Sequence, residues 1–263
     1  DPNVIFYNPA GLSYLTNSPV SFSFVKHLVD INLASLAYST NLKNIGRIGA
    51  AVQYINYGTF IAADEMGNKT GRYKAGEAAF IGGYSNILAP QFSYGVNVKF
   101  IYSSIADRIS TAFAFDVGLH YSIPSYQVEI GFAILNMGSQ IKAYYSTKED
   151  LPLNVVIGIS KRLQHLPLDL FLDFHELNRR TNNFFSKFNA FSIGAEFRLS
   201  KALRLRFGYN NERRNELRIG TFAGLAGFNV GLGVIISGYR FDYGYSSLGL
   251  IGAVNRISIS TNL

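Results

Sequence analysis

The stretch that decides the fold is Phe92–Tyr102, which reads FSYGVNVKFIY. Large apolar side chains recur at every second residue, and Ser93, Gly95, Asn97 and Lys99 stand between them. Successive side chains of a strand point to opposite faces, so the pattern predicts a strand with one apolar and one polar face. Its length exceeds the roughly five or six residues of most soluble strands and matches the roughly nine to eleven that a tilted strand needs to cross a bilayer.

The same alternation recurs along most of the chain. It is clearest in 111–122 and 203–210, where aromatic and aliphatic residues alternate with Gly, Ala and charged residues. Fourteen segments are predicted to be strands: 19–26, 30–39, 46–57, 75–86, 91–103, 111–122, 126–136, 152–162, 168–177, 188–198, 203–210, 226–236, 239–246 and 254–263. An even number of antiparallel strands closes without an edge and returns both ends of the chain to one side.

The connectors give an independent indication of the orientation. Those after even-numbered strands are short: 40–45, 87–90, 123–125, 163–167, 199–202 and 237–238. Those after odd-numbered strands are longer on the whole: 27–29, 58–74, 104–110, 137–151, 178–187, 211–225 and 247–253. Long loops outside and tight turns in the periplasm are typical of outer-membrane barrels. We therefore expect a multi-pass outer-membrane protein with both termini in the periplasm.

The composition narrows the class of protein. Hydrophobic residues make up 48% of the 263, and mean hydropathy is +0.11, yet no run of 18 apolar residues occurs, which excludes a helical membrane protein. The absence of Cys excludes disulfides, thiolate metal sites and cysteine nucleophiles. The net charge of +7 is spread along the chain without a basic run, so nucleic acid is not expected as a partner.

Alternation alone leaves a soluble β-sandwich open, because the apolar face could point into a core or out to lipid. A closed barrel of fourteen strands is too wide to fill with apolar side chains, so its polar face should line the interior. The residues assigned to that face are Lys99, Asp116, Glu129, Asp173, Glu196, Arg198, Arg204, Arg206, Arg240 and Asp242. The predicted fold class is therefore all-β, a 14-stranded antiparallel transmembrane barrel over 19–263, with a short plug segment at 1–18.

The head of the chain carries the sequence Asn8-Pro9-Ala10-Gly11. Asn caps helices and Pro pre-sets the first helical turn, so a short helix should begin here and lead into the first strand. This motif resembles the start of FadL-type outer-membrane barrels and of the PorV/PorQ family. The resemblance implies a fourteen-stranded barrel in which the N-terminal segment lies inside as a plug.

Further stretches resemble the PorV/PorQ family along nearly the whole chain. They are 53–58, 64–71, 140–145, 151–152, 158–163, 207–210, 213–214, 223–228 and 255–258. The resemblance implies a component of the type IX protein secretion system. It also implies surface partners similar to PorZ, to the sortase PorU and to the barrel PorV, which handle and anchor exported cargo.

Catalysis is not expected from the titratable residues. Asp116 and His120 share the inward face, but four residues along a strand separate them by about 13 Å, too far for a base and its orienting group. The acidic loop 64–70 lacks the ligand spacing of a calcium site, and Gly67-Asn68 in it predicts a hairpin tip. We expect no enzyme activity, no metal and no cofactor.

Two long loops carry the candidate partner-binding residues. The first contains Arg179, Arg180, Phe184 and Phe185, and the second contains Arg213, Arg214 and Arg218. Arginine beside exposed aromatics is a composition that favours protein interfaces, and arginine also binds the phosphates of lipopolysaccharide. A solvated rim of mixed charge is the other interpretation.

Two functions remain open. The first is a non-enzymatic scaffold of the type IX system that anchors surface partners through its outer loops. The second is a FadL-like channel for hydrophobic small molecules, which requires an apolar pocket under the plug. The polar inward face predicted above argues against the channel.

Overall fold

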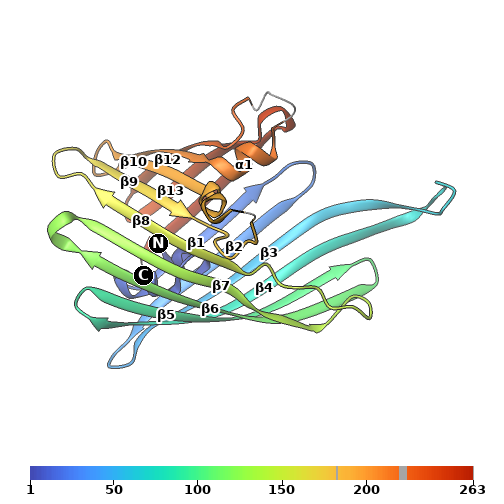
Figure 1. The fold of residues 1–263 in the computed structure, drawn as a ribbon, viewed down its shortest axis with the longest axis horizontal. Helices are drawn as coiled ribbons and strands as arrows, with labels where there is room; N and C mark the ends of the chain where they lie inside the picture. Colours follow the sequence, from blue (N-terminus) through green and yellow to red (C-terminus); the bar gives the residue numbers. More distant parts are fainter. Residues whose placement is uncertain (182, 219–223, 263) are drawn as a thin grey trace.

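The structure is a computed structural model that describes residues 1–181, 183–218 and 224–262. Fourteen antiparallel strands form a closed barrel in which each strand pairs with its neighbours in sequence and β1 closes on β14 (Figure 1). The predicted fold class is confirmed.

The barrel closes where β1 meets β14, with Pro19 opposite Asn262 and Lys26 opposite Asn255. The strands are β1 (Pro19–Lys26), β2 (Asn32–Leu42), β3 (Gly46–Ala63), β4 (Lys69–Ala89), β5 (Phe92–Ile105), β6 (Arg108–Ile123), β7 (Val128–Lys142), β8 (Asn154–Arg162), β9 (Leu168–Phe174), β10 (Phe191–Arg198), β11 (Leu203–Asn210), β12 (Phe228–Ile236), β13 (Tyr239–Ser247) and β14 (Ala253–Asn262). All fourteen predicted segments are strands, with shifted ends.

The two faces of the wall differ as the alternation predicts. Apolar side chains point outward and are exposed on every part of the wall, among them Phe22, Leu36, Phe80, Val98, Phe115, Phe241 and Ile257. Polar residues of the same strands are buried inside, including Ser21, Ser35, Asn97 and Asp116. An apolar exterior around a polar interior suits a barrel that lies in lipid.

The prediction of a loop at 58–74 was wrong. β3 and β4 continue as a paired hairpin to Ala63 and Lys69, so only 64–68 form the turn. A register shift between Asn56 and Thr59, with Gly58 at φ +88°, separates this extension from the wall. The hairpin projects well beyond the barrel (Figure 1), and we call residues 57–74 the arm.

The connectors 104–110 and 137–151 are also shorter than predicted, because β5, β6 and β7 extend into them. Segments 168–177 and 188–198 are instead shorter strands, since β9 ends at Phe174 and β10 begins at Phe191. The wall is therefore tall over β3–β7 and low over β8–β10 (Figure 1). The turns after even-numbered strands remain short throughout.

The described residues also contain six short helices. They are η1 (Pro2–Phe6), η2 (Pro9–Tyr14), η3 (Pro124–Tyr126), η4 (Phe184–Asn189), α1 (Asn211–Glu216) and η5 (Gly249–Ile251). Within the described ranges, none of them has the length and hydropathy to cross a bilayer.

Candidate functional site: the lumen and the outer loops

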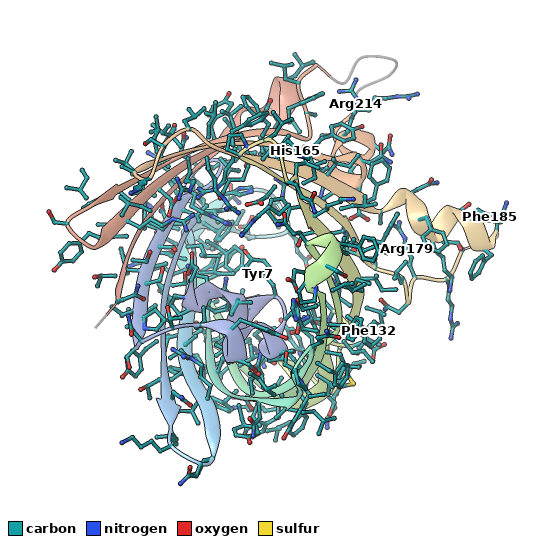
Figure 2. All side chains as sticks on the ribbon, turned by 90° about the vertical axis from the view of Figure 1, so that its left-hand side faces the viewer. Tyr7, Phe132, His165, Arg179, Phe185 and Arg214 are labelled. Carbon is teal, nitrogen blue, oxygen red and sulfur yellow. The ribbon has the colours of Figure 1, made fainter. Side chains whose placement is uncertain are left out.

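The N-terminal segment, residues 1–18, lies inside the barrel against β1–β6 (Figure 2). η2 begins as predicted: Asn8 caps it by accepting a hydrogen bond from the backbone N–H of Ala10 at 3.0 Å. Ile5 and Leu12 are fully buried, and they pack over the inner face of the wall at Gly49 and Gly83. η1 was not predicted from the sequence; it precedes the Asn8-Pro9-Ala10-Gly11 motif and is capped by Asp1.

Glycines in the wall make this packing possible. Gly95 and Gly118 stand opposite one another on β5 and β6. A Cβ on Gly95 would lie 2.4 Å from the carbonyl carbon of Pro9, and one on Gly118 would lie 2.0 Å from Oδ1 of Asn8. The backbone of η2 can approach the sheet this closely only where the wall carries no side chains.

A buried polar network on the same strands, β5 and β6, also holds the segment. The amide of Asn97 donates to the carbonyl of Ile5 and to a carboxylate oxygen of Asp116, both at 2.8 Å. Asp116 also accepts from Nζ of Lys99 and from the backbone N–H of Asn136, again at 2.8 Å each. Asp116 has no exposed surface, so a charged pair and two amides satisfy it completely.

Further polar bonds fix the segment along its length. The hydroxyls of Ser85 and Ser93 donate to the carbonyl of Ala10 at 3.1 and 3.2 Å. The guanidinium of Arg47 donates to the carbonyls of Leu15 and Asn17, where the segment turns into β1. Asn8 in addition donates its side-chain amide to carbonyls of β6 and β7.

The rest of the lumen is lined by ion pairs. Arg206 donates to Glu196 at 2.6 Å and to Asp242 at 2.7 Å, and Arg240 meets Asp242 at 2.9 Å. A cavity of 860 Å³ separates these strands from the N-terminal segment. Charged side chains predicted to face inward, Arg206, Arg240 and Asp242, therefore do line this cavity, together with aromatic and aliphatic residues.

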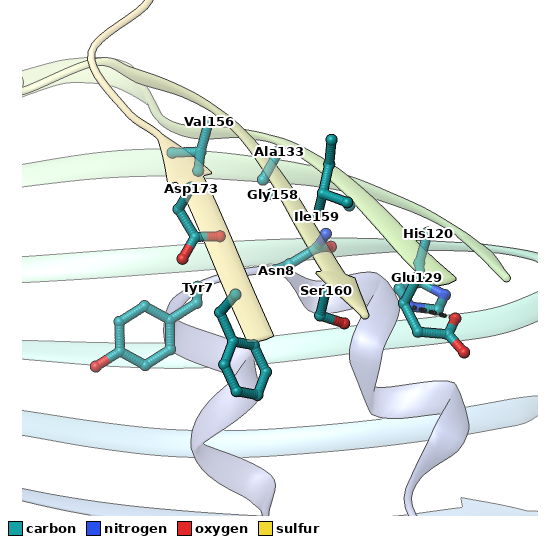
Figure 3. A pocket seen from close by; sticks show the side chains of 12 residues that line it. Tyr7, Asn8, His120, Glu129, Ala133, Val156, Gly158, Ile159, Ser160 and Asp173 are labelled. Atoms are coloured by element: carbon teal, nitrogen blue, oxygen red, sulfur yellow. Dashed lines mark ion pairs between the residues drawn. The ribbon is translucent and has the colours of Figure 1, made fainter. Parts of the chain in front are cut away.

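A smaller cavity of 230 Å³ lies between the N-terminal segment and β6–β9 (Figure 3). Tyr7, Ala133 and Phe171 give it an apolar part, and His120 with Glu129 gives it a polar end. His120 Nε2 is 3.3 Å from the carboxylate of Glu129, so its partner is not Asp116, as the strand spacing predicted. Among the described residues, no three His, Asp or Glu side chains form a metal-binding group.

An ion-pair cluster joins the two candidate outer loops. Glu212 of α1 accepts from Nε2 of His175 at 3.0 Å and from Arg179 at 3.2 Å, and Arg179 also approaches Glu176 at 3.6 Å. Burial, followed by the nearby charge of Glu176, raises the pKa of Glu212 above its ordinary value. Arg179 is thus engaged in holding the loops together, a role that its position in the sequence did not indicate.

Two aromatic residues of the first loop are exposed, and a third packs against the end of a barrel strand. Phe184 and Phe185 are 66% and 75% exposed on η4, which projects sideways from the wall (Figure 2). Phe188 packs on both Phe174 and Phe184, which fixes η4 to the end of β9. Arg180 is exposed in the same loop.

Two candidate arginines of the second loop, Arg213 and Arg214, make their contacts elsewhere. Arg213 lines the 860 Å³ cavity. Arg214 donates to the carbonyl of Gly224 at 3.1 Å and lies over the ring of Phe228, so it stabilises its own loop. Arg218 also has a partner, and residues 219–223 after it lie outside the described part. Arg213 and Arg214 therefore contact the cavity and their own loop, and the partner-binding role of the seven residues stays a prediction.

No family model and no curated protein matches the chain. Solved structures do match. The toluene transporter TbuX of Ralstonia pickettii has a TM-score of 0.66 at 12% identity over 100% of this chain and 94% of that one.

Two further structures give the same result. The toluene transporter TodX of Pseudomonas putida has a TM-score of 0.59 at 12% identity over 98% and 91% of the two chains. A FadL homologue of Pseudomonas aeruginosa has a TM-score of 0.59 at 11% identity over 100% and 94%. The chain is a FadL-like, fourteen-stranded outer-membrane β-barrel in its fold.

Proposed function

We propose that this barrel is a non-enzymatic scaffold of the type IX secretion system that holds surface proteins through its outer loops. The observation that carries the proposal is η4, where Phe184 and Phe185 are exposed on a segment that the ion pairs of Glu212 and the stacking of Phe188 hold in place. Aromatic side chains and arginine are enriched in interface hot spots, and Arg180 is exposed in the same loop. The type IX assignment itself rests on the resemblance of the sequence segments to the PorV/PorQ family.

The lumen supports this function indirectly. Its lining is charged and hydrogen-bonded, and the N-terminal segment is fastened on one side through buried polar bonds to Asn97, Ser85 and Arg47. A scaffold needs no passage through its barrel, and a segment held by this many bonds is costly to move. We expect partners similar to PorZ, PorU and PorV, with lipopolysaccharide around the rim.

Co-purification from native outer membranes tests the scaffold. We expect the tagged barrel to bring a surface-exposed protein with it, and the double variant Phe184→Ser, Phe185→Ser to lose most of that protein. Leu166→Ser is the matched control, because Leu166 is an exposed apolar residue in the turn at the opposite end of the barrel. Recovery of the wild-type barrel without any surface protein would refute the proposal.

The comparisons with solved structures favour the second function, a channel for hydrophobic small molecules. TbuX and TodX are toluene transporters, and the 230 Å³ cavity with Tyr7, Ala133 and Phe171 is the place where an apolar ligand would fit. The test is uptake of toluene by vesicles that contain the purified barrel. Uptake above that of empty vesicles, lost in Ala133→Phe, would establish the channel.

A further inference from the structure

The 860 Å³ cavity has an unbalanced lining. It lies between the N-terminal segment and β11–β14, and its charged side chains are Arg206, Arg213, Arg240 and Arg256 against Asp1 and Asp242. Neither function proposed above uses this space. An excess of arginine in a narrow cavity with low-dielectric walls concentrates positive potential there.

Two of these arginines stand at opposite ends of one row of the sheet. Across four neighbouring strands, Arg206 pairs with Gly231, Gly231 with Gly244, and Gly244 with Arg256. The row spans three strand spacings, roughly 14 Å along the wall. Since both middle residues are glycines, the floor between the two guanidinium groups carries no side chains.

Arg206 and Arg256 differ in the number of hydrogen bonds and ion pairs that they make. Arg206 directs Nε to Glu196 and Nη1 to Asp242, while its Nη2 is buried with no hydrogen-bond partner among the described residues. Arg256 is exposed to the cavity and has no ion pair or hydrogen bond in the described part of the chain. Its neighbours in the row, Gly244 and Val25, offer no polar side chain.

We propose that this glycine-floored space binds an oxyanion, a phosphate- or carboxylate-bearing solute, through Arg256 with Arg206 across the floor and Arg213 further out. Guanidinium groups bind such groups bidentately, and arginines lining a pore select anions. A bound anion supplies the counter-charge that Arg256 lacks inside the barrel. The cavity volume of 860 Å³ admits a ligand larger than a single phosphate.

Titration calorimetry on the full-length barrel in detergent tests the site, with pyrophosphate and citrate as probes at constant ionic strength. We expect saturable binding of at least one probe, and Arg256→Gln to weaken it at least tenfold. Binding of pyrophosphate alone indicates a phosphate-bearing ligand, and binding of citrate alone indicates a carboxylate. Either result supports the site.

Two further variants keep the test independent of folding defects. Gly244→Val fills the floor without changing any charge, and its Cβ has room because the nearest atom would be Cβ of Arg256 at 3.8 Å; we expect it to weaken binding as well. Arg72→Gln, on the exposed arm, removes the same charge elsewhere and should bind as wild type. Failure of both probes to bind the wild-type barrel, or equal binding by Arg256→Gln, would overturn the proposal.

Discussion

At the scale of single residues, the position of the N-terminal segment depends on glycines of the wall as much as on its polar side chains. Gly95→Ala places a Cβ 2.4 Å from the backbone of Pro9, which cannot yield as a flexible side chain would. We expect a loss of about 1–3 kcal/mol from overpacking, and partial release of the N-terminal segment. Chymotrypsin should then cleave at Phe6, Tyr7 or Tyr14 faster than it does in the wild type.

Gly82→Ala is the control for that experiment, because no atom lies within 4 Å of the added Cβ. Equal protection of the segment in both variants would contradict the close approach of η2 to the wall.

Asp116 is a fully buried carboxylate of the lumen with three polar partners. Asp116→Asn leaves the charge of Lys99 buried without its counter-ion, and we expect a loss of about 3–5 kcal/mol in unfolding free energy. Urea titration in detergent micelles measures this. Asp107→Asn, on an exposed turn, should change the midpoint little; a similar small effect at Asp116 would show that the buried pair contributes no stability.

At the scale of elements, the arm shows why the sequence predicted a loop at 58–74 where the structure has a hairpin. Water surrounds both faces of the arm, so burial imposes no alternation there, and Thr59–Ala63 carries none. In the wall, lipid and lumen impose opposite polarities on the two faces, and the alternation is clean. The sequence therefore predicts the strands of the wall. It does not predict their extension into the arm, where the alternation is absent.

The candidate site was less predictable than the fold for a related reason. Alternation assigns a residue to the lumen but does not say which lumen residue it meets. The partners of Asp116 and Glu212 come from strands and loops whose register the sequence does not reveal. The row of Arg206, Gly231, Gly244 and Arg256 depends on the register of four strands, which the sequence does not reveal.

The arm itself gives a testable prediction. A two-stranded hairpin that extends beyond its sheet is marginally stable in water, even with the stacking of Phe60 on Tyr73. We expect amide hydrogens of 59–63 and 69–73 to exchange at least a hundredfold faster than those of 47–55 in the wall, as measured by mass spectrometry. Comparable protection in the two regions would indicate that the arm is covered by something else.

At the scale of the whole molecule, three features indicate a barrel that lies in a membrane. They are the outward apolar face, the polar lumen and the unequal lengths of the connectors at the two ends. Apolar side chains on the outside, such as Phe115 and Phe241, have no protein to cover them and require lipid. The long connectors gather at the end that bears the arm, and the tight turns at the other (Figure 1). Both proposed functions need the arm end to face the cell exterior.

The absence of Cys makes this orientation directly measurable. Met66→Cys places a single thiol at the exposed tip of the arm, and Lys201→Cys places one in the tight turn between β10 and β11. We predict that a membrane-impermeant maleimide labels the first variant on intact cells, and the second only after the outer membrane is permeabilised. Labelling of Lys201→Cys but not Met66→Cys on intact cells, or recovery of the protein in the soluble fraction, would contradict the account.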